Sequence, residues 1–326
     1  MGATGVYTGD PQFQVGLAGL TGDWVPVCVN CQYTHTQNRQ RFGFLMPHSV
    51  SERLPGDLKL QNRLQVVPGD GVKLDDFDPD KTYGLKNDEG SQKTLQKLVA
   101  RLAHLQYLLY ASKKYALLVI LQGMDCSGKD GTIRQVMSQV NPQGCRVTSF
   151  KTPSAEEAAH DFLWRIHPAV PDRGMIGIFN RSHYEDVLIV RVHKLVPETV
   201  WSTRYKEINS FEKILAENNV KLLKFYLHIS RQEQKKRFQQ RLQDRAKWWK
   251  LSPSDFQERN YWKSYKAAYE DALRHCSTPW APWYVIPANK KWFRNLAISQ
   301  IIVKTLEDMN MKFPKPTFDV SQFIRS

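Results

Sequence analysis

The segment ALLVILQGMDCSGKDGTIRQVM, residues 116–137, constrains the fold of this chain more than any other stretch. It opens with a continuous apolar run of strand length, residues 116–121, which is typical of a parallel strand covered on both faces. Gly123, Gly128 and Lys129 then complete the pattern G-x-x-x-x-G-K. In such a loop the backbone N–H groups point into one hollow, the following helix adds its positive end, and the lysine reaches the outer phosphates. The segment therefore predicts a strand, a phosphate-binding loop and a helix.

Two acidic residues distinguish this loop from the usual pattern. Asp130 follows the lysine, where a Ser or Thr that holds Mg²⁺ is usual. Asp125 lies inside the glycine turn, and because phosphate repels a carboxylate, we expect it to bind a metal ion or take a proton. A chance glycine turn is the alternative, and the strand–loop–helix context argues against it. The residues assigned to the phosphate loop are Gly123, Gly128, Asp130 and Gly131.

The composition narrows the class of protein. The chain has 326 residues, 41% of them hydrophobic, which is enough for a substantial core. It lacks an apolar run of about 18 residues that would suggest a membrane span, and its first residues lack the features of a signal peptide. Five scattered cysteines fit a reducing compartment, so we expect a cytoplasmic protein. The net charge of +14 predicts a polyanionic partner.

We divide the chain into an N-terminal extension, an arm with a helix, a phosphate-loop domain with a lid, and a C-terminal tail. Their expected bounds are 1–60, 61–115, 116–314 with the lid at about 231–256, and 315–326. The extension is rich in polar residues and is expected to be poorly ordered. It holds an isolated C-x-x-C pair, Cys28 and Cys31, and an alternative start at Met46. Leucines at helical spacing predict that the helix of the arm packs on the core.

Apolar runs separated by helical patterns predict an α/β fold. Besides residues 116–121, the expected strands are 145–150, 175–180, 220–229 and 283–287. They predict a mainly parallel five-stranded sheet with helices on both faces, a three-layer α/β/α architecture. A capping box of Ser154 and Glu157 predicts a helix from about Ser154 that carries residues 162–164.

Polar residues follow several of the predicted strands. They are the phosphate loop, Lys151, the cluster at residues 180–186 and the segment after His228. Because ligands of parallel sheets bind beyond the carboxyl ends of the strands, we expect these residues to form one site.

Positive charge is concentrated in residues 231–250, which hold eight basic and two acidic residues, a net charge of +6. Arg237, Arg241 and Arg245 are spaced four apart and are expected to share one helical face. This pattern predicts a cationic lid over the phosphate loop, with a merely solvated helix as the alternative.

From about residue 66 to residue 314, the chain resembles the polyphosphate kinase 2 family. The motifs that carry the resemblance are GMDCSGKDG (123–131), NPQGCRV (141–147), FNRSHYEDVLIVRVH (179–193), FYLHIS (225–230), KWWKLSPSD (247–255) and APWYVIPANKK (281–291). The resemblance implies a P-loop kinase-like fold with a lid that transfers phosphate between inorganic polyphosphate and nucleotides. Many members have Asp-Arg-Ser after the third strand, whereas this chain has Asn-Arg-Ser at 180–182. It is therefore similar to the class that acts on both AMP and ADP.

The resemblance also implies roles for individual residues. Asp125, Lys129 and Arg181 match the catalytic residues of the family, and Mg²⁺, or Mn²⁺ in its place, is the implied metal ion. Asp125 is the first metal candidate, and Glu185 and Asp186 are further candidates with a structural role as the alternative. Lys151, Asn180 and Arg191 are candidates for binding nucleotide or phosphate. The lid residues expected to bind polyphosphate are Arg237, Arg241, Lys247 and Lys250.

Two other functions stay open at this point. A nucleoside monophosphate kinase with ATP as donor would share the fold, the loop and the lid. A P-loop nucleic-acid-binding module would account for the net charge but leaves the carboxylates of Asp125 and Asp130 unexplained. We expect inorganic polyphosphate and purine nucleotides as partners, with no membrane or nucleic acid, and we expect a homo-oligomer.

Overall fold

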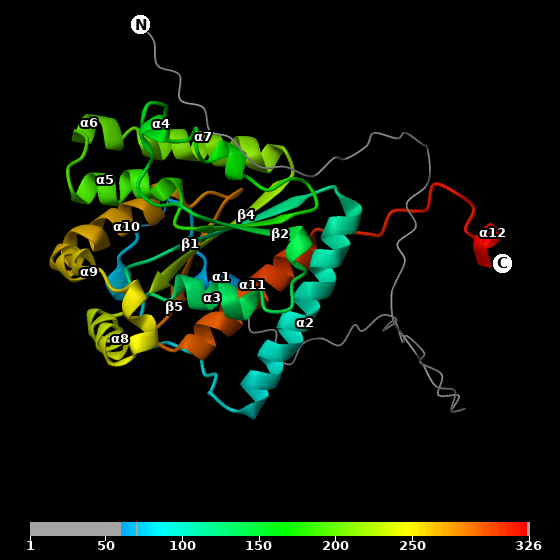
Figure 1. The fold of residues 1–326 in the computed structure, drawn as a ribbon, viewed down its shortest axis with the longest axis horizontal. Coiled ribbons are helices and arrows are strands. Elements are labelled where there is room, and N and C mark those ends of the chain that lie inside the picture. The colour runs from blue at the N-terminus through cyan, green and yellow to red at the C-terminus, as the bar shows by residue number, and fades with distance from the viewer. Residues whose placement is uncertain (1–59, 70, 325–326) are drawn as a thin grey trace, which may run out of the picture. The chain divides into compact units, whose positions relative to one another are not determined.

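Five parallel strands form the sheet that positions the phosphate loop (Figure 1). The computed structural model describes residues 60–69 and 71–324, and the strands lie in the order β2-β3-β1-β4-β5. Their bounds are β1 Ala116–Gln122, β2 Cys145–Ser149, β3 Ile176–Asn180, β4 Val220–His228 and β5 Trp283–Pro287. All five predicted strands are confirmed, with small shifts at their ends. The predictions for residues 1–59, with Cys28, Cys31 and Met46, lie outside the described residues.

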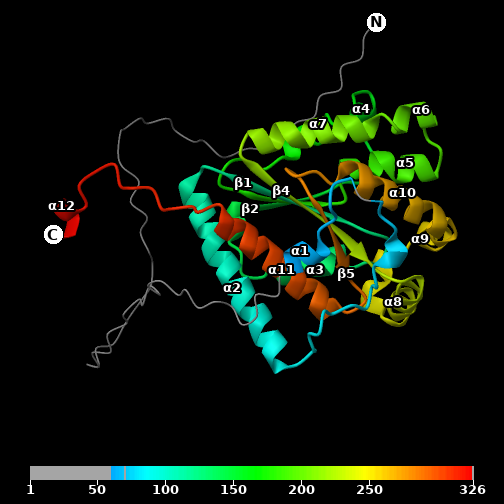
Figure 2. The same cartoon turned by 180° about the vertical axis from the view of Figure 1, so that it is seen from behind.

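Helices cover both faces of the sheet (Figures 1 and 2). The α-helices are α1 Leu60–Leu64, α2 Glu89–Ser112, α3 Lys129–Val136, α4 Ala155–Ala158, α5 Ile189–Val192, α6 Glu198–Trp201, α7 Arg204–Glu217, α8 Arg231–Gln243, α9 Pro253–Glu258, α10 Trp262–Cys276, α11 Lys291–Asp308 and α12 Ser321–Ile324. The 3₁₀ helices are η1 Leu74–Asp76, η2 Pro142–Gly144, η3 His167–Ala169, η4 His183–Val187, η5 Arg245–Lys250 and η6 Arg259–Tyr261. Within the described ranges, no helix combines the length and apolarity that crossing a bilayer requires.

The central strand β1 alternates between two hydrophobic cores. Leu117, Val119 and Leu121 belong to the core that contains the buried residues of α2 and α11. Leu118 and Ile120 belong to the core that contains residues of α7. Because successive side chains of a strand point to opposite faces, this apolar run requires helices on both sides of the sheet.

The predicted arm reaches the sheet at its β5 edge. The Val66 amide donates to the Trp283 carbonyl at 2.8 Å, and Gln65 pairs with Tyr284 in an antiparallel bridge. Further along, α2 packs lengthwise on α11 and buries Leu98 and Leu102 (Figure 2). The prediction that this leucine-rich helix packs on the core is therefore confirmed.

The helix predicted from Ser154 is shorter than expected. Its capping box is present, since the Ser154 hydroxyl accepts from the Glu157 amide at 3.1 Å and Glu157 accepts from the Ser154 amide at 2.9 Å. However, α4 ends at Ala158, so residues 162–164 lie outside it. The Asp161 carboxylate accepts from the Leu163 amide and starts a new turn, which competes with continuation of the helix.

Candidate active site

The phosphate loop joins β1 to α3 through backbone conformations that require glycine. Gly123 has φ of +148°, and a Cβ there would lie 2.9 Å from the Leu227 carbonyl oxygen. Gly128 has φ of +102°, and a Cβ there would lie 2.1 Å from Nη1 of Arg294. Cys126 is held at φ +63° without being glycine. A left-handed non-glycine residue costs conformational energy and is common at functional sites.

Lys129 lies at the first position of α3 and folds back over the loop. Its Nζ donates to the Gly123 carbonyl at 2.8 Å and to the Met124 carbonyl at 3.5 Å. Burial, reinforced by the nearby Arg181 guanidinium, lowers the pKa of Lys129 to about 8. No side chain caps the N-terminus of α3, which leaves its first amides available to an anion.

Asp125 and Arg181 face each other at the carboxyl ends of β1 and β3. Nη2 of Arg181 lies 2.9 Å from Oδ1 of Asp125, and Arg181 itself is held at φ +63°. Burial works to lower the pKa of Arg181, but the carboxylates of Glu185 and Asp125 outweigh it and raise that pKa. The structure thus brings together the three residues predicted as catalytic, Asp125, Lys129 and Arg181.

The two further metal candidates differ in their surroundings. Glu185 is half-buried and acts electrostatically on both Arg181 and Lys129, so it lies beside the loop. Asp186 pairs with Arg204, whose Nη1 lies 3.0 Å from Oδ1, and burial raises the pKa of Asp186 to about 6. This ion pair supports the structural alternative for Asp186, whereas Glu185 stays a candidate metal ligand.

Mg²⁺ suits the donors that this site offers. Among residues 60–69 and 71–324, no group of three or more His, Cys, Asp or Glu side chains could enclose a metal ion. Mg²⁺ does not need such a cage, because it keeps several waters and commonly binds one or two carboxylates together with substrate phosphates. The half-buried carboxylates of Asp125 and Glu185 match that requirement.

Asp130 links the loop to its neighbours. Its carboxylate accepts from Nδ2 of Asn180 at 2.9 Å and pairs with Nζ of Lys250 at 2.8 Å. The hydrogen bond from Lys250 is the largest cause that lowers the pKa of Asp130. Lys250 belongs to η5 in the predicted lid segment, so this ion pair connects that segment to the start of α3.

The structure contradicts the expected orientation of Arg237. Its guanidinium is 6% exposed and donates to the carbonyls of Cys126 and Ser127 in the loop, at 2.9 Å each. It also donates to the Ala288 and Asn289 carbonyls after β5 and pairs with Glu233. Arg237 therefore fastens the lid helix to the loop backbone and does not face a substrate channel.

The other predicted cations of the lid are more accessible. Arg241 is half-buried near Cys126 and Asp255, where it acts on both their pKa values. Lys247 is exposed and pairs with Asp244 at 2.5 Å. Arg245 does not share the helical face with Arg241, because α8 ends at Gln243 and Asp244 caps the following η5.

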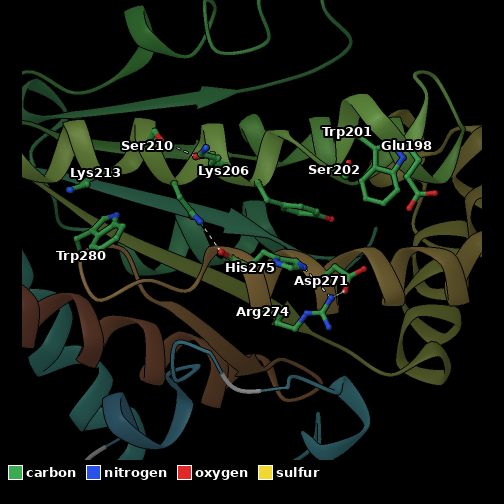
Figure 3. A pocket seen from close by; sticks show the side chains of 12 residues that line it. Glu198, Trp201, Ser202, Lys206, Ser210, Lys213, Asp271, Arg274, His275 and Trp280 are labelled. Carbon is green, nitrogen blue, oxygen red and sulfur yellow. Dashed lines mark hydrogen bonds and ion pairs between the residues drawn. The ribbon is translucent and has the colours of Figure 1, made fainter.

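Two residues predicted to bind nucleotide or phosphate, Lys151 and Arg191, form no hydrogen bond with the phosphate loop in the described part of the chain. Lys151 follows β2 with an exposed side chain at the carboxyl edge of the sheet. Arg191 donates to Asp271 at 2.7 Å and to the Tyr205 hydroxyl at 3.3 Å. Asp271 and Tyr205 line a cavity of about 670 Å³ between α7 and α10 (Figure 3). Arg191 thus contacts two residues of the cavity wall, and no hydrogen bond among the described residues joins it to the phosphate loop.

Sequence reasoning missed three residues that contact or approach the loop. Nε2 of Gln234 donates to the Asp125 carbonyl at 2.9 Å. Asp255, on α9, lies close to Asp125. Burial is the main cause that raises the pKa of Asp255, and the negative charge of Asp125 raises it further. Nη1 of Arg294 donates to the Ser127 carbonyl. Asp255 stands inside the motif KWWKLSPSD and could have been found there, whereas Gln234 and Arg294 carry no local signal.

A glycine loop on a parallel sheet, a loop lysine, a carboxylate–arginine pair and a neighbouring basic helix are the features of a P-loop phosphotransferase. The chain belongs to the polyphosphate kinase 2 family, since the sequence profile described as Polyphosphate kinase 2 (PPK2) matches residues 85–314. The family predicted from the motifs is thereby confirmed.

Relatives match most of the chain. The "AMP/ADP-polyphosphate phosphotransferase" of Meiothermus ruber is 50% identical over 257 residues, which cover 78% of this chain and 96% of the relative. The "ADP-polyphosphate phosphotransferase" of Rhodopseudomonas palustris is 44% identical, covering 78% of this chain and 92% of the relative. The crystal structure of polyphosphate kinase 2 from Arthrobacter aurescens TC1 is similar with a TM-score of 0.78 at 42% identity, covering 82% and 95% of the two chains.

Proposed function

We propose that this protein transfers phosphoryl groups between inorganic polyphosphate and the nucleotides AMP and ADP. The observation that carries the proposal is the Asp125–Arg181 pair beside Lys129, at the mouth of a phosphate loop that a basic lid contacts. The names of the relatives from Meiothermus ruber and Rhodopseudomonas palustris support the substrate class.

The chemistry requires positioning and neutralisation of charge more than a strong base. The attacking nucleotide phosphate is already largely ionised at neutral pH, since its second pKa is about 6. In the proposed role, Lys129 and the first amides of α3 hold the transferring phosphate. Arg181 stabilises its equatorial oxygens. Asp125 orients the attacking phosphate and, with Glu185, would hold Mg²⁺ or Mn²⁺, which neutralises phosphate charge when bound.

The lid supplies the track for the polymer in this proposal. Polyphosphate carries roughly one negative charge per unit, so its binding needs several cations that the polymer can reach. Arg241, Lys247 and exposed Lys151 are the cations we assign to this track, with Lys250 of η5 contributing near Asp130. We also propose a cytoplasmic location and a homo-oligomer. The location is supported by the free thiols of Cys126, Cys145 and Cys276.

The experiment that tests the proposal supplies polyphosphate as the only donor. Purified protein is mixed with Mg²⁺, ADP and polyphosphate, and ATP is followed by luciferase luminescence. ATP that forms only when polyphosphate is present supports the proposal. ATP that forms equally from ADP alone would identify the ATP-dependent monophosphate kinase, which disproportionates ADP. Salt-sensitive binding of RNA or DNA without any transfer would identify the nucleic-acid-binding module.

A further inference from the structure

Two buried guanidinium groups converge on one carbonyl oxygen behind the phosphate loop. Nη1 of Arg237 lies 2.9 Å from the Ser127 carbonyl oxygen, and Nη1 of Arg294 lies 3.3 Å from the same atom. Ser127 is fully buried, Arg294 is 2% exposed and Arg237 is 6% exposed. The contact is tight, since a Cβ on Gly128 would overlap Nη1 of Arg294.

The stability of the fold alone does not favour an arginine at position 294. Within the described ranges no ion pair includes it, and its remaining donors, Nε and Nη2, reach the amide oxygen of Asn295 at 3.1 and 2.8 Å. It also lies in the first turn of α11, where the helix dipole disfavours a cation. Burial, with the nearby Arg237 charge, lowers the pKa of Arg294 to about 9. A buried cation without a carboxylate costs stability unless an anion arrives.

The geometry indicates where that anion binds. In a trans peptide the N–H points opposite to the C=O, so a Ser127 carbonyl held by two arginines turns the Gly128 N–H away from them. None of the hydrogen bonds in the described part of the chain uses that N–H. Two cations on the carbonyl oxygen also polarise the peptide and strengthen its N–H as a donor.

We propose that Arg294, together with Arg237, is a positioning residue for phosphoryl transfer. The pair fixes and polarises the Ser127–Gly128 peptide so that the Gly128 N–H donates to an oxygen of the transferring phosphate. Arg294 supplies a positive charge close behind the loop that remains uncompensated until the phosphate binds. This inference deepens the proposed function and rests on it for the identity of the donor.

The test removes the charge of Arg294 and keeps the volume of its side chain. Arg294→Gln keeps a polar group, Arg294→Met replaces the buried ion by an apolar side chain, and Arg294→Lys restores the charge. Arg134→Gln is the matched control, because Arg134 is exposed on α3 and its loss changes the net charge equally. The readouts are kcat and KM for transfer, calorimetric binding of tripolyphosphate, and the melting temperature.

A positioning role predicts that Arg294→Gln and Arg294→Met lose about 10- to 100-fold in kcat/KM, with most of the loss in kcat. Tripolyphosphate binds them more weakly, while their melting temperatures stay at or above that of the wild type, because the cost of the buried cation is removed. Arg294→Lys recovers part of the activity, and Arg134→Gln stays within about twofold of the wild type.

The contrary results are equally distinct. A folded Arg294→Gln enzyme with wild-type kcat and wild-type tripolyphosphate affinity would overturn the proposal. Failure of both the Gln and the Met variants to fold would also overturn it, since it would make Arg294 a residue of the fold. If the wild type uses ATP and not polyphosphate, the donor assignment fails, and the same variants compared with ATP still decide the role of Arg294.

Discussion

Asp125 is the residue on which the proposed chemistry depends most. It stands inside a loop built to attract anions, and the Arg181 guanidinium at 2.9 Å holds its carboxylate there. Its backbone carbonyl is also fixed by Gln234 from the lid helix. A carboxylate in this position is available to a metal ion and to the attacking phosphate. A purely structural ion pair would not need to lie inside a phosphate loop.

Replacing Asp125 by Asn should abolish transfer and leave the fold intact. The amide keeps the shape but loses the charge that the metal ion and Arg181 need, so we expect kcat to fall at least about 100-fold, or about 2.7 kcal/mol. Steady-state kinetics with a thermal melt check this, and Asp172→Asn, at an exposed position before β3, is the control. A folded and active Asp125→Asn enzyme would contradict the role.

Lys129 should give the reaction an alkaline limit. Its pKa is lowered to about 8, so the free enzyme loses the ammonium as the pH rises through that value. We expect kcat/KM for polyphosphate to fall about tenfold per pH unit well above pH 8. In the pH profile of kcat, the same fall should begin at a higher pH, because bound phosphate favours the charged form of the lysine. A flat kcat/KM profile from pH 7 to 10 would argue against Lys129 as the phosphate-binding cation.

At the scale of elements, the predicted lid comprises α8, η5 and α9 (Figure 1). Arg237 and Arg241 are one turn apart on α8, yet their environments differ: Arg237 is buried against the loop backbone, and Arg241 is half-buried near Asp255. On the same helix, Arg237 therefore holds the loop backbone, whereas Arg241 is a candidate for substrate binding. Mutations of these two residues should have different effects.

Arg241→Ala should weaken polyphosphate binding more than nucleotide binding. We expect KM for polyphosphate to rise about tenfold, since one charge-assisted contact contributes on the order of 1.5 kcal/mol. Lys235→Ala, which removes a charge from the exposed face of the same helix, is the control. KM values for both substrates separate the two effects, and equal losses for polyphosphate and nucleotide would remove the assignment.

Arg237→Ala should instead destabilise the protein. It removes the buried donor of the Cys126, Ala288 and Asn289 carbonyl oxygens and of the Glu233 carboxylate, and leaves the Ser127 carbonyl with Arg294 alone. We expect a loss of about 3–5 kcal/mol in the free energy of unfolding, against about 0.5 kcal/mol or less for Lys235→Ala. Urea unfolding measures the loss in both variants. An Arg237→Ala protein with the wild-type midpoint would show that the contacts of Arg237 are dispensable.

These elements also mark what sequence could and could not predict. The strands β1, β3, β4 and β5 were predictable because they are largely buried apolar runs, and the phosphate loop because its glycines have a local pattern, whereas β2 is mostly exposed and mixed in polarity. Helical spacing placed Arg237 and Arg241 on one face but could not tell which of them meets a carbonyl from a distant loop. For the same reason Arg294, 167 residues from Ser127 in sequence, gave no signal.

At the scale of the whole molecule, parallel topology gathers distant segments at one edge of the sheet. Asp125 follows β1, Asn180 is the last residue of β3 and Arg181 comes directly after it. The predicted lid follows β4. The net charge of +14 would favour any polyanion, whereas this edge combines cations with the carboxylates that we propose as metal ligands. This combination distinguishes a phosphotransferase from a protein that only binds nucleic acid.

The most direct test of polyphosphate as donor uses AMP, which an ATP-dependent monophosphate kinase cannot phosphorylate without ATP. Purified wild-type protein and Asp125→Asn are incubated with AMP, polyphosphate and Mg²⁺, and the phosphorus NMR spectrum is recorded over time. We predict that ADP and then ATP resonances grow in the wild-type sample as the internal polyphosphate signal declines, and that neither changes with Asp125→Asn. An unchanged wild-type spectrum, in a sample that does phosphorylate AMP once ATP is added, would contradict the account.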